Sequence, residues 1–586
     1  MERRILMAFA LSFLVFTLYI RFVAPPPPEQ PVTPAAPAVP AVEDAPSPPA
    51  GAPSTGPAPE TTPALVTDPA TDSVEAPTGE VREDREERKI TVDTPLYLAV
   101  FSNRGARLES FVLKQYLDEE GGLFQMIPVE ATERLDLHPL DLDLEDAALT
   151  GVIKAALFEP SVRQLVLNAG ESKEMTFEWA DGRGHVVRKR LGFSGDTYRL
   201  AVDASVQREG TELSKRIMFG PGVGEVSREG TYVQPDKGVV GAGGQLEFFS
   251  ASDVEEFQGA AVGVQVVGVS AHYFAALMVP EEIGRYAAVL SRDTLEWEDE
   301  GEGSRRRDFI SAALEAQNAP LLFTLFVGPK EQDRLAELGP GLEGVVDYGD
   351  WMRFLALPLR SALLWIHGYV GNFGWSIVLL TIGINILLIP LKQYSYVSMR
   401  KMQKLAPQIK RIQERYKKLK PTDPKKQEMN KEVYGLYREH NVSPLSGCLP
   451  MVLMIPFFFA FYRLLMVSLE LRHAPWILWI QDLSTFDPMF VLPILMGASQ
   501  VAIQKLSPQT SADPMQARMM MLMPVVFVFI LAWAPAGLVL YWFVNNLVSL
   551  VQQGVTNRML SEDSSGNGSS GTGKKKKKGS RKESES

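Results

Sequence analysis

The feature that most constrains this chain is a run of 39 consecutive residues, from Met519 to Asn557, without a single Asp, Glu, Lys or Arg. About 20 apolar residues are enough for a helix to cross the hydrocarbon of a bilayer, so one helix of this length would overshoot it. The sequence APAG at Ala534–Gly537 offers a turn near the middle of the run. The run therefore predicts two successive transmembrane helices, near 519–535 and 537–556.

Further apolar segments extend the membrane part of the chain. Residues 361–391 hold 31 positions without a charged side chain, which is more than one span needs. We assign 372–391 to a span, and the amphipathic region before it to a helix that lies at the membrane interface. Two more spans are predicted near 447–469 and 488–505, so residues 346–560 form a core of five transmembrane helices.

The N-terminus adds a sixth span. Residues 1–23 carry Arg3 and Arg4 in front of an apolar stretch, as both a cleaved signal peptide and an uncleaved anchor do. The stretch lacks an A-x-A-like cleavage site and is long for a signal peptide, which favours the anchor. Residues 24–89 are rich in Pro, Ala, Thr and Glu and then in charges. They cannot bury enough apolar surface to fold, so we expect a disordered linker.

Residues 90–345 have the pattern of β-structure. Segments such as Glu174–Trp179 and Thr197–Val206 alternate polar and apolar residues between Gly and Asp turns. This period-two pattern over about 250 residues predicts an all-β sandwich. Residues 24–350 contain 28 Lys and Arg against 56 Asp and Glu, whereas the rest of the chain contains 31 against 14. The acidic domain and the basic, apolar core must therefore occupy different surroundings.

The distribution of cationic residues predicts the orientation in the membrane. Cytoplasmic loops carry an excess of Lys and Arg, and residues 392–446 hold 14 of them against 5 acidic residues. The tail at 561–586 contains the run Lys574–Lys578, which suits either RNA binding or plain solvation. With the basic start of the anchor also inside, both termini are cytoplasmic and the β-domain lies outside the cytoplasmic membrane.

The basic segment also has a helical pattern. Residues 400–441 are predicted to form a hairpin of two helices, with Pro407 at the start of the first and a turn at Lys420–Pro424. The hairpin either only satisfies the positive-inside rule or is a docking surface for nascent chain, ribosome or anionic lipid, and we favour docking. The apolar seam of its first helix continues from Met402 through Leu405, Ile409, Ile412, Tyr416 and Leu419.

Polar side chains occur at bilayer depth in three of the predicted spans. Such residues are costly in hydrocarbon and mark functional positions, unless they only join helices by hydrogen bonds. Three uncharged stripes together favour a water-filled cavity, and their lack of charge argues against an ion-coupled pump. The stripe residues are Thr381, Asn385, Gln500, Gln504, Asn545, Asn546 and Ser549.

Two other core spans, near 447–469 and 519–535, are instead rich in Met, Phe and Val. Flexible Met-rich and aromatic surfaces accept varied apolar partners, although plain lipid contact would use the same residues. The side chains concerned are Met451, Met454, Phe457, Phe458, Met523, Phe527 and Phe529.

No sequence motif of enzymatic chemistry is present. There is no H-E-x-x-H, no P-loop and no G-x-S-x-G pattern, so we expect no enzymatic activity, no metal and no other cofactor. Two further hypotheses stay open. One is a small-solute transporter, for which the spans lack internal symmetry. The other is an envelope enzyme that acts on glycans through the β-domain.

The core sequence resembles a known family. SIVLLTIGINILLIPLKQYS, SPLSGCLPMVLMIPFFFAFYRLL and PAGLVLYWFVNNLVSLVQQ are similar to segments of the YidC membrane-protein insertases, and the likeness covers about 350–560. Residues 90–345 resemble more loosely the periplasmic domain of the Gram-negative members. The resemblance implies an insertase and chaperone of the bacterial inner membrane, with a periplasmic β-supersandwich and a five-helix core around a hydrophilic groove open to cytoplasm and lipid.

The resemblance also implies partners and roles for residues. The partners would be nascent inner-membrane proteins, membrane lipid, the Sec translocon with its accessory subunits, and the ribosome through the basic hairpin and lysine tail. The polar stripes, together with Trp542, would form the groove, and the Met- and Phe-rich surfaces would form a slide for the client's apolar helix. One position departs from the family, since most members have an arginine where this chain has Asn385. Lys392 and Lys505, near the predicted cytoplasmic rim, are then the candidates for attracting acidic clients.

Overall fold

The computed structural model describes residues 80–118, 120–224, 235–254, 257–299, 303–349, 352–416, 425–440, 449–506 and 514–566. The predicted N-terminal anchor, most of the predicted linker and the lysine run lie outside the described residues.

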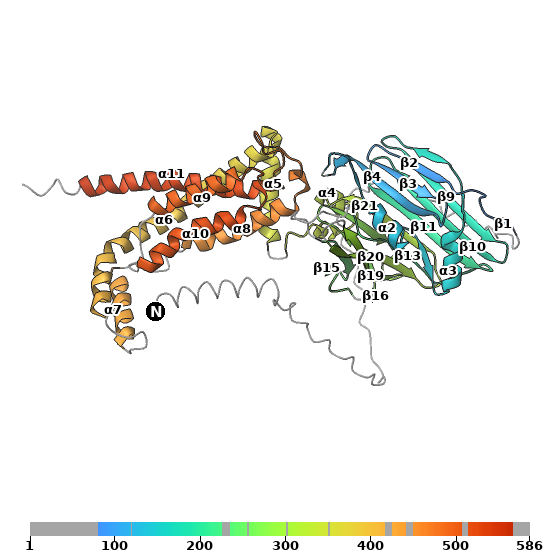
Figure 1. Ribbon diagram of the computed structural model, residues 1–586, viewed down its shortest axis with the longest axis horizontal. Helices are drawn as coiled ribbons and strands as arrows, with labels where there is room; N and C mark the ends of the chain where they lie inside the picture. The colour runs from blue at the N-terminus through green and yellow to red at the C-terminus, as the bar shows by residue number, and fades with distance from the viewer. Residues whose placement is uncertain are drawn as a thin grey trace, which may run out of the picture. The chain divides into compact units, whose positions relative to one another are not determined.

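Residues 80–349, called the β-domain below, are built from three sheets (Figure 1). Within the described residues the largest sheet has eleven strands, in the order β1-β9-β10-β11-β21-β18-β17-β14-β15, with β7 paired to β9 and β12 to β11. The bounds in chain order are β1 (Val81–Arg82), β7 (Glu159–Pro160), β9 (Ser172–Asp181), β10 (His185–Ser194), β11 (Arg199–Arg208), β12 (Thr211–Glu212), β14 (Lys237–Ala242), β15 (Gln245–Ser250), β17 (Val264–Ser270), β18 (Phe274–Pro280) and β21 (Leu321–Pro329).

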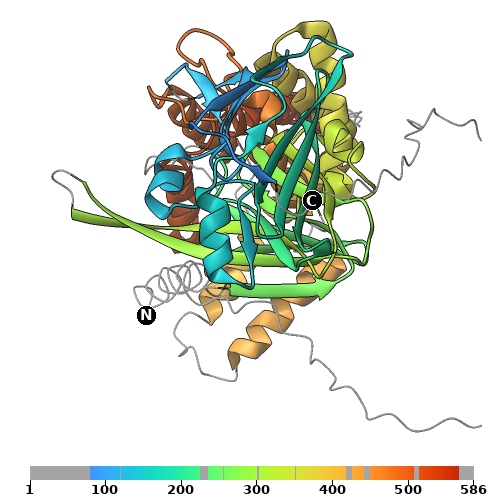
Figure 2. The ribbon, with the colours of Figure 1, turned by 90° about the vertical axis from the view of Figure 1, so that its right-hand side faces the viewer.

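Two five-stranded sheets complete the domain. One has the order β16-β19-β20-β13-β6, and the other has the order β5-β4-β3-β2-β8, in which β2 and β8 are parallel. Their strands are β2 (Lys89–Asp93), β3 (Tyr97–Ser102), β4 (Arg107–Leu117), β5 (Leu123–Gln125), β6 (Leu142–Leu144), β8 (Gln164–Val166), β13 (Lys215–Phe219), β16 (Phe257–Val262), β19 (Ala287–Asp299) and β20 (Gly303–Ala316). Figure 2 shows the β19–β20 hairpin extending well beyond the neighbouring strands. The short helices are α2 (Val129–Leu135), α3 (Ala147–Ala155), α4 (Gln332–Ala336) and the 3-10 turn η1 (Leu342–Val345).

The alternation seen in the sequence is confirmed by the strands. The segment Glu174–Trp179 lies within β9, and most of Thr197–Val206 lies within β11. On β11 the side chains of Leu200 and Val202 are buried, whereas Ala201 between them is exposed, as a period of two requires. The all-β prediction for this region therefore holds, apart from the short helices.

The β-domain begins about ten residues earlier than the predicted start at residue 90. Val81 and Arg82 pair with β9, and β2 already begins at Lys89, so the last residues of the predicted linker are part of the fold. One of the charges that indicated a solvated segment, Arg82, forms an ion pair with Glu178 on β9. A short charged stretch can join a sheet edge through its backbone, which charge patterning does not report.

The C-terminal part is helical. Its helices are α5 (Arg353–Val370), α6 (Phe373–Arg415), α7 (Lys425–Glu439), α8 (Leu449–Val467), α9 (Val491–Leu506), α10 (Pro514–Leu531) and α11 (Ala536–Gly566), with a 3-10 turn η3 (Leu469–Leu471). Two stretches, Phe373–Pro390 of α6 and Ala536–Arg558 of α11, are long and apolar enough to cross a membrane. The shorter apolar stretches are Pro456–Val467, Val491–Leu506 and Met521–Leu531.

The junction between α5 and α6 follows from two residues. Gly371 adopts a left-handed conformation with φ of 67°, which ends α5 where a residue with a Cβ atom would be strained. The side chain of Asn372 then accepts a hydrogen bond from the backbone nitrogen of Trp375 and so caps α6. The predicted break between the amphipathic helix and the first core span is confirmed.

Helix α6 is longer than the sequence suggested. It continues without interruption through Pro390 and Pro407 to Arg415, so Pro407 does not begin a separate helix, and the span and the first arm of the hairpin are one helix. A proline inside a helix removes one hydrogen bond. Ending the helix there would leave several backbone groups without partners near the membrane, which costs more.

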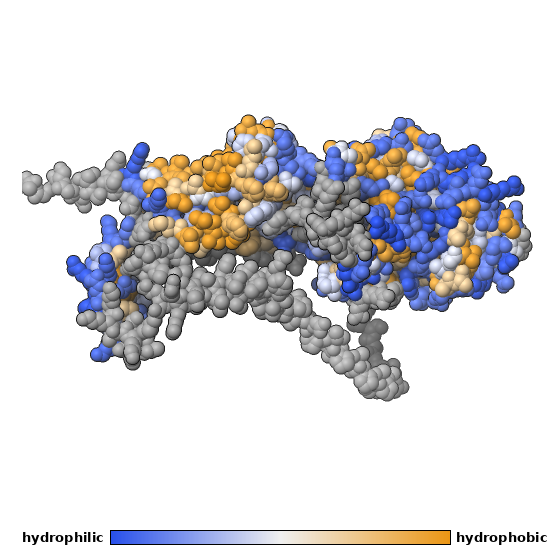
Figure 3. All heavy atoms as spheres, viewed as in Figure 1, coloured by the Kyte–Doolittle hydropathy of each residue, from blue (hydrophilic) through white to orange (hydrophobic). Residues whose placement is uncertain are grey.

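The surface of the helical part is largely apolar outside the hairpin. Figure 3 shows hydrophobic residues gathered over most of these helices, whereas hydrophilic residues dominate over α7 and over the strands. Large apolar side chains of α6, α9, α10 and α11 are exposed, among them Leu387, Ile494, Phe529 and Val551. An apolar surface of this extent on several adjoining helices requires lipid rather than water around it.

Candidate functional site

Three helices bring the polar stripes together. Helix α11 contacts both α6 and α9, and each carries polar residues of the predicted groove. Thr381 and Asn385 are buried on α6, Gln500 is half-buried on α9, and Asn546 is buried on α11. These residues thus lie on contacting helices, although the environment of each differs.

On α6 the polar side chains form a chain of hydrogen bonds along the helix. Thr381 Oγ1 donates to the carbonyl oxygen of Ile377 at 2.7 Å. Asn385 Nδ2 donates to the carbonyl oxygen of Thr381 at 2.8 Å, and Asn385 Oδ1 accepts a hydrogen bond of 2.5 Å from Lys392 Nζ. The amide of Asn385 is therefore occupied on both sides, whereas sequence reasoning expected it to face water or a client.

Asn546 joins α11 to α9. Its Nδ2 donates to Ser499 Oγ at 3.0 Å and lies 3.3 Å from the carbonyl oxygen of Met496. Ser499 Oγ in turn donates to the same carbonyl at 2.6 Å. This arrangement is an interhelical hydrogen-bond network, the alternative that the sequence left open for each polar residue.

Gln500 and Asn545 differ from Asn546. The side-chain oxygens Gln500 Oε1 and Asn545 Oδ1 are inaccessible to solvent, and neither accepts a hydrogen bond within the described part of the chain. A buried acceptor without a donor costs about 1–3 kcal/mol. A hydrogen-bond donor placed against either oxygen would remove this cost. Gln504 and Ser549 are half-buried on the same two helices.

Trp542 lies between the aromatic faces of α8 and α10. Its ring is 4.7 Å from that of Phe458 in an edge-to-face arrangement and 5.4 Å from that of Phe527. The resemblance implies that Trp542 belongs to the groove with the polar stripes. The rings that pack against it belong to the Met- and Phe-rich surfaces, so Trp542 connects α11 to them.

The Met- and Phe-rich surfaces are partly open. Met523 is 44% exposed and Phe529 is 70% exposed on α10, while Phe457, Phe458 and Phe527 are half-buried. The side chains of Met451 and Met454 lie outside what the structure describes. These surfaces thus combine half-buried aromatic side chains on α8 and α10 with exposed, adaptable apolar side chains on α10.

The helical hairpin is formed by the end of α6 and by α7, which contact each other. Met402, Leu405 and Ile409 are buried and pack against Val433, Leu436 and Tyr437 of α7. Ile412 and Tyr416 are half-exposed, and Tyr416 Oη donates to Glu432 Oε1 at 3.0 Å. The seam is confirmed over its first half, whereas Leu419 and the predicted turn lie outside the described residues.

Sequence reasoning did not identify the residues that hold the loop between α8 and α9. Asp487 is buried and accepts hydrogen bonds from the backbone nitrogens of Met489 and Leu492 and from Trp479 Nε1, the last at 2.9 Å. It stabilises the start of α9 by offering a carboxylate to free N–H groups. An aspartate a few residues before an apolar helix is a recognisable capping signal, so the sequence did contain this information.

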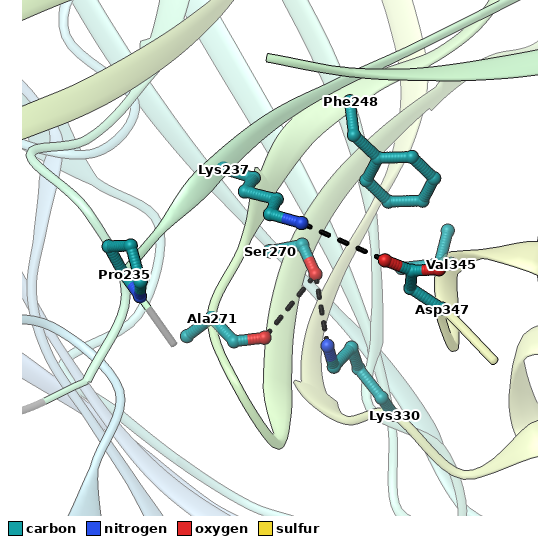
Figure 4. A pocket seen from close by; sticks show the side chains of 8 residues that line it. All are labelled: Pro235, Lys237, Phe248, Ser270, Ala271, Lys330, Val345 and Asp347. Atoms are coloured by element: carbon teal, nitrogen blue, oxygen red, sulfur yellow. Dashed lines mark hydrogen bonds and ion pairs between the residues drawn. The ribbon is translucent and has the colours of Figure 1, made fainter. Parts of the chain in front are cut away.

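The β-domain contains a small pocket between β14, β17 and the segment that leads to α5. Figure 4 shows Lys237 directed at Asp347, with a separation of 3.7 Å, and Lys330 directed at Ser270, with a hydrogen bond of 3.2 Å. Its volume of about 10 Å³ has room for one water molecule. Because ligand pockets typically measure about 300–1,000 Å³, this pocket does not support the hypothesis of an enzyme that acts on glycans.

The fold and the site define a class of protein. An apolar helical core with uncharged polar residues between contacting helices, joined in one chain to an all-β domain and a basic helical hairpin, is the structure expected of a polytopic membrane protein.

Comparison with known proteins identifies the family within that class. The family described as "60Kd inner membrane protein" matches residues 365–563, and the one described as "YidC periplasmic domain" matches residues 89–362. A membrane protein insertase YidC of Syntrophus aciditrophicus is 33% identical over 95% of this chain and 100% of its own length. One of Geobacter metallireducens is 35% identical over 96% of this chain and 99% of its own length.

The chain therefore belongs to the YidC family of membrane protein insertases. It is an inner-membrane protein with a periplasmic β-sandwich domain, it acts on nascent membrane proteins, and it is not an enzyme. A solved structure described as an active YidC insertase with its first transmembrane domain resolved covers 81% of this chain and 94% of its own, with 20% identity and a TM-score of 0.34. The family assignment rests on the sequence relatives.

Proposed function

We propose that this insertase receives the polar segment of a client in a hydrophilic groove between α6, α9 and α11, while the client's apolar helix passes along α8 and α10. The observation that carries this proposal is the pair of buried acceptors, Gln500 Oε1 and Asn545 Oδ1, that have no donor within the described residues. Polar atoms left in this state inside an apolar core are costly, and a client backbone or bound water would satisfy them.

The energetics of insertion need no nucleotide. A polar loop that crosses a full bilayer loses its hydrogen bonds to water, and polar groups offered at bilayer depth lower that cost. Transfer of the client's apolar helix into lipid is favourable and supplies the driving force. The groove thus lowers a barrier, and the lipid determines the final position of the client.

The slide is supported by the neighbours of Trp542. Phe458 and Phe527 pack against this ring, so α8 and α10 are held beside the groove helix α11. Met523 and Phe529 remain exposed on α10. An apolar client helix that leaves the groove would meet these side chains before it meets lipid.

The membrane topology and the partners belong to the same proposal. Six spans, including an N-terminal anchor, place both termini in the cytoplasm by the positive-inside rule. The basic hairpin and the lysine run would then face the ribosome, whose phosphate-rich RNA attracts cations. The periplasmic domain would contact accessory subunits of the Sec translocon.

The test is site-specific photo-crosslinking during insertion. The purified protein is placed in proteoliposomes with a photoreactive residue at Gln500, Asn545 or Phe529, and at Val551 as a lipid-facing control. A two-span client is then inserted and followed by protease protection. The polar loop should crosslink to positions 500 and 545, and the apolar helix to position 529. Efficient insertion with equal crosslinking at all four positions would contradict the groove.

A further inference from the structure

We propose that the turn between β17 and β18 holds the C-terminal end of α8 in position for insertion, with His272 and Arg472 as the positioning residues on the two sides of the contact. The inference rests on the proposed slide along α8 and goes beyond it, because it gives the β-domain a role in placing that slide. The observation behind it is a hydrogen bond of 2.5 Å between His272 Nε2 and the carbonyl oxygen of Met466.

His272 satisfies a backbone carbonyl group at the end of α8. The last four carbonyl groups of a helix have no partner within the helix, and Met466 is the penultimate residue of α8, which ends at Val467. Because a carbonyl oxygen can only accept, Nε2 of His272 carries the proton of this bond. His272 is 6% exposed, so the bond is shielded from water.

Arg472, which directly follows η3, lies in an aromatic cluster of the β-domain. Its guanidinium carbon is 5.2 Å from the ring centre of Phe124, 5.6 Å from that of Phe274 and 5.9 Å from that of Tyr273. A cation is attracted to the face of an aromatic ring within about 6 Å of its centre. Phe124 and Phe274 also stack on each other at 4.1 Å, so the cluster is assembled within the β-domain itself.

The segment between α8 and α9 has further contacts that restrain it. Tyr273 forms a hydrogen bond with the side chain of Ser484, which precedes α9. Arg360 of α5 donates through Nε to Glu470 of η3 at 3.1 Å. The turn between β17 and β18 thus contacts the end of α8, the residue after η3 and the segment before α9.

The restraint reaches the part of α8 that a client would meet. Phe459 is 47% exposed on α8 and lies seven residues before Met466, which corresponds to two helical turns, about 10.5 Å. Two turns of hydrogen-bonded helix move as one unit, so fixing the carbonyl of Met466 also fixes the direction of Phe459. Between the two, Phe461 stacks on Tyr541 of α11 at 4.4 Å, which joins this part of α8 to the groove helix.

The first measurement is hydrogen exchange of the backbone amides at 463–471 in the full-length protein in proteoliposomes. His272→Leu removes the donor on the β-domain, and Arg472→Met removes the charge on the other side but keeps the apolar stem. Each should speed exchange by roughly fivefold, the change in an equilibrium expected from loss of one such contact. Arg472→Lys should retain most of the protection, because an ammonium group also binds aromatic rings. Arg183→Met, at an exposed position between β9 and β10, should change nothing.

The second measurement tests whether the restraint serves insertion. A photoreactive residue replaces Phe459 on α8 or Phe529 on α10, and a two-span client is inserted into the same proteoliposomes. In His272→Leu and Arg472→Met, crosslinking of the client's apolar helix at 459 should fall by roughly fivefold relative to crosslinking at 529, because only α8 has lost its restraint. A general loss of folded protein would instead lower crosslinking at both positions together.

The outcomes separate this inference from the proposed slide. Unchanged exchange at 463–471 in both single variants overturns the restraint. Faster exchange with an unchanged ratio of crosslinking at 459 and 529 overturns its role in insertion, and so does an equal fall at both positions. If the wild type gives no crosslink at either position, the proposed slide fails and the role in insertion fails with it, whereas the exchange rates still decide whether the β-domain holds α8.

Discussion

Asn546 Nδ2 on α11 lies 3.0 Å from Ser499 Oγ on α9, and this hydrogen bond joins the two helices. The preceding residue, Asn545, has a buried side-chain oxygen that accepts no hydrogen bond within the described residues. The two adjacent asparagines therefore have different roles: Asn546 stabilises the packing of α9 and α11, and Asn545 has an unsatisfied hydrogen-bond acceptor.

This difference gives a matched pair of variants. Asn546→Leu should lower the stability of the protein by about 1 kcal/mol because an interhelical bond is lost, with insertion per folded molecule unchanged. Asn545→Leu should leave stability the same or higher and should slow insertion. Thermal unfolding in detergent and insertion assays on the same preparations measure both effects. The reverse result, with Asn545→Leu destabilising and active, would show that the assignment is wrong.

Helices α9 and α10 are close at Gly497. A Cβ atom at this position would lie 2.2 Å from Val528 Cγ2, whereas one at Gly383 of α6 would meet nothing within 4 Å. Gly497→Ala should therefore destabilise the protein by about 1–3 kcal/mol through overpacking. Gly383→Ala should be neutral or stabilising by up to about 1 kcal/mol, because alanine favours helix. Adding Val528→Ala to Gly497→Ala should restore much of the melting temperature, and failure to do so would exclude the steric cause.

The helical hairpin depends on Ile409. This side chain is buried against α7, and an aspartate there should weaken the pairing of α6 and α7 by about 2–5 kcal/mol, through lost packing and a buried charge. We expect Ile409→Asp to increase proteolysis within 400–441 and to reduce insertion. Gln408→Asp introduces the same charge at an exposed position and should have little effect on either. If the Ile409→Asp protein is cleaved more readily within the hairpin but still inserts clients at the normal rate, this result argues against a role of the hairpin in docking.

The β-domain contains a lysine that gives a pH dependence. Lys189 is completely buried, and its Nζ donates to the carbonyl oxygens of Gly105, Ala106 and Leu140. Burial lowers the pKa of Lys189 to about 7 from its usual 10.5, while the charge of Asp141 acts in the opposite direction.

Between pH 7 and 10 the unfolded chain keeps this proton and the folded domain releases it. The contribution of Lys189 to stability therefore rises with pH, by at most about 1.4 kcal/mol per pH unit. Urea unfolding of a fragment spanning 80–348, at pH 7, 8 and 9, should show a smaller rise for Lys189→Met than for the wild type. Equal slopes in the two proteins would mean that Lys189 stays protonated throughout.

The sequence predicted much of the fold because two periodicities were clear. Alternation at Glu174–Trp179 predicted β9, and the pair Gly371–Asn372 predicted the end of α5 and the start of α6. Prediction from the sequence was less reliable where a local propensity competes with tertiary contacts. Pro390 and Pro407 are helix breakers by propensity, yet α6 continues through both because the membrane and α7 stabilise it.

The candidate site was predictable as a set of residues but not as a set of roles. Spacing placed Thr381 and Asn385 on one face of α6, and burial agrees with it. Spacing did not reveal that Asn546 bonds to Ser499, that Trp542 lies between Phe458 and Phe527, or that Lys392 turns inward to Asn385. Each of these depends on which atom of a neighbouring turn or helix lies within hydrogen-bonding or packing distance.

Composition, charge distribution and hydrophobic period by themselves determined the class of the protein: an apolar helical core, an acidic β-domain and a basic hairpin. These properties are sums over many residues, so single errors do not change them. Only the tertiary structure decided which polar atoms are satisfied and which are left open. A hydrogen bond forms only where the donor–acceptor distance is correct to within a few tenths of an ångström, and no local pattern encodes that distance for residues far apart in the chain.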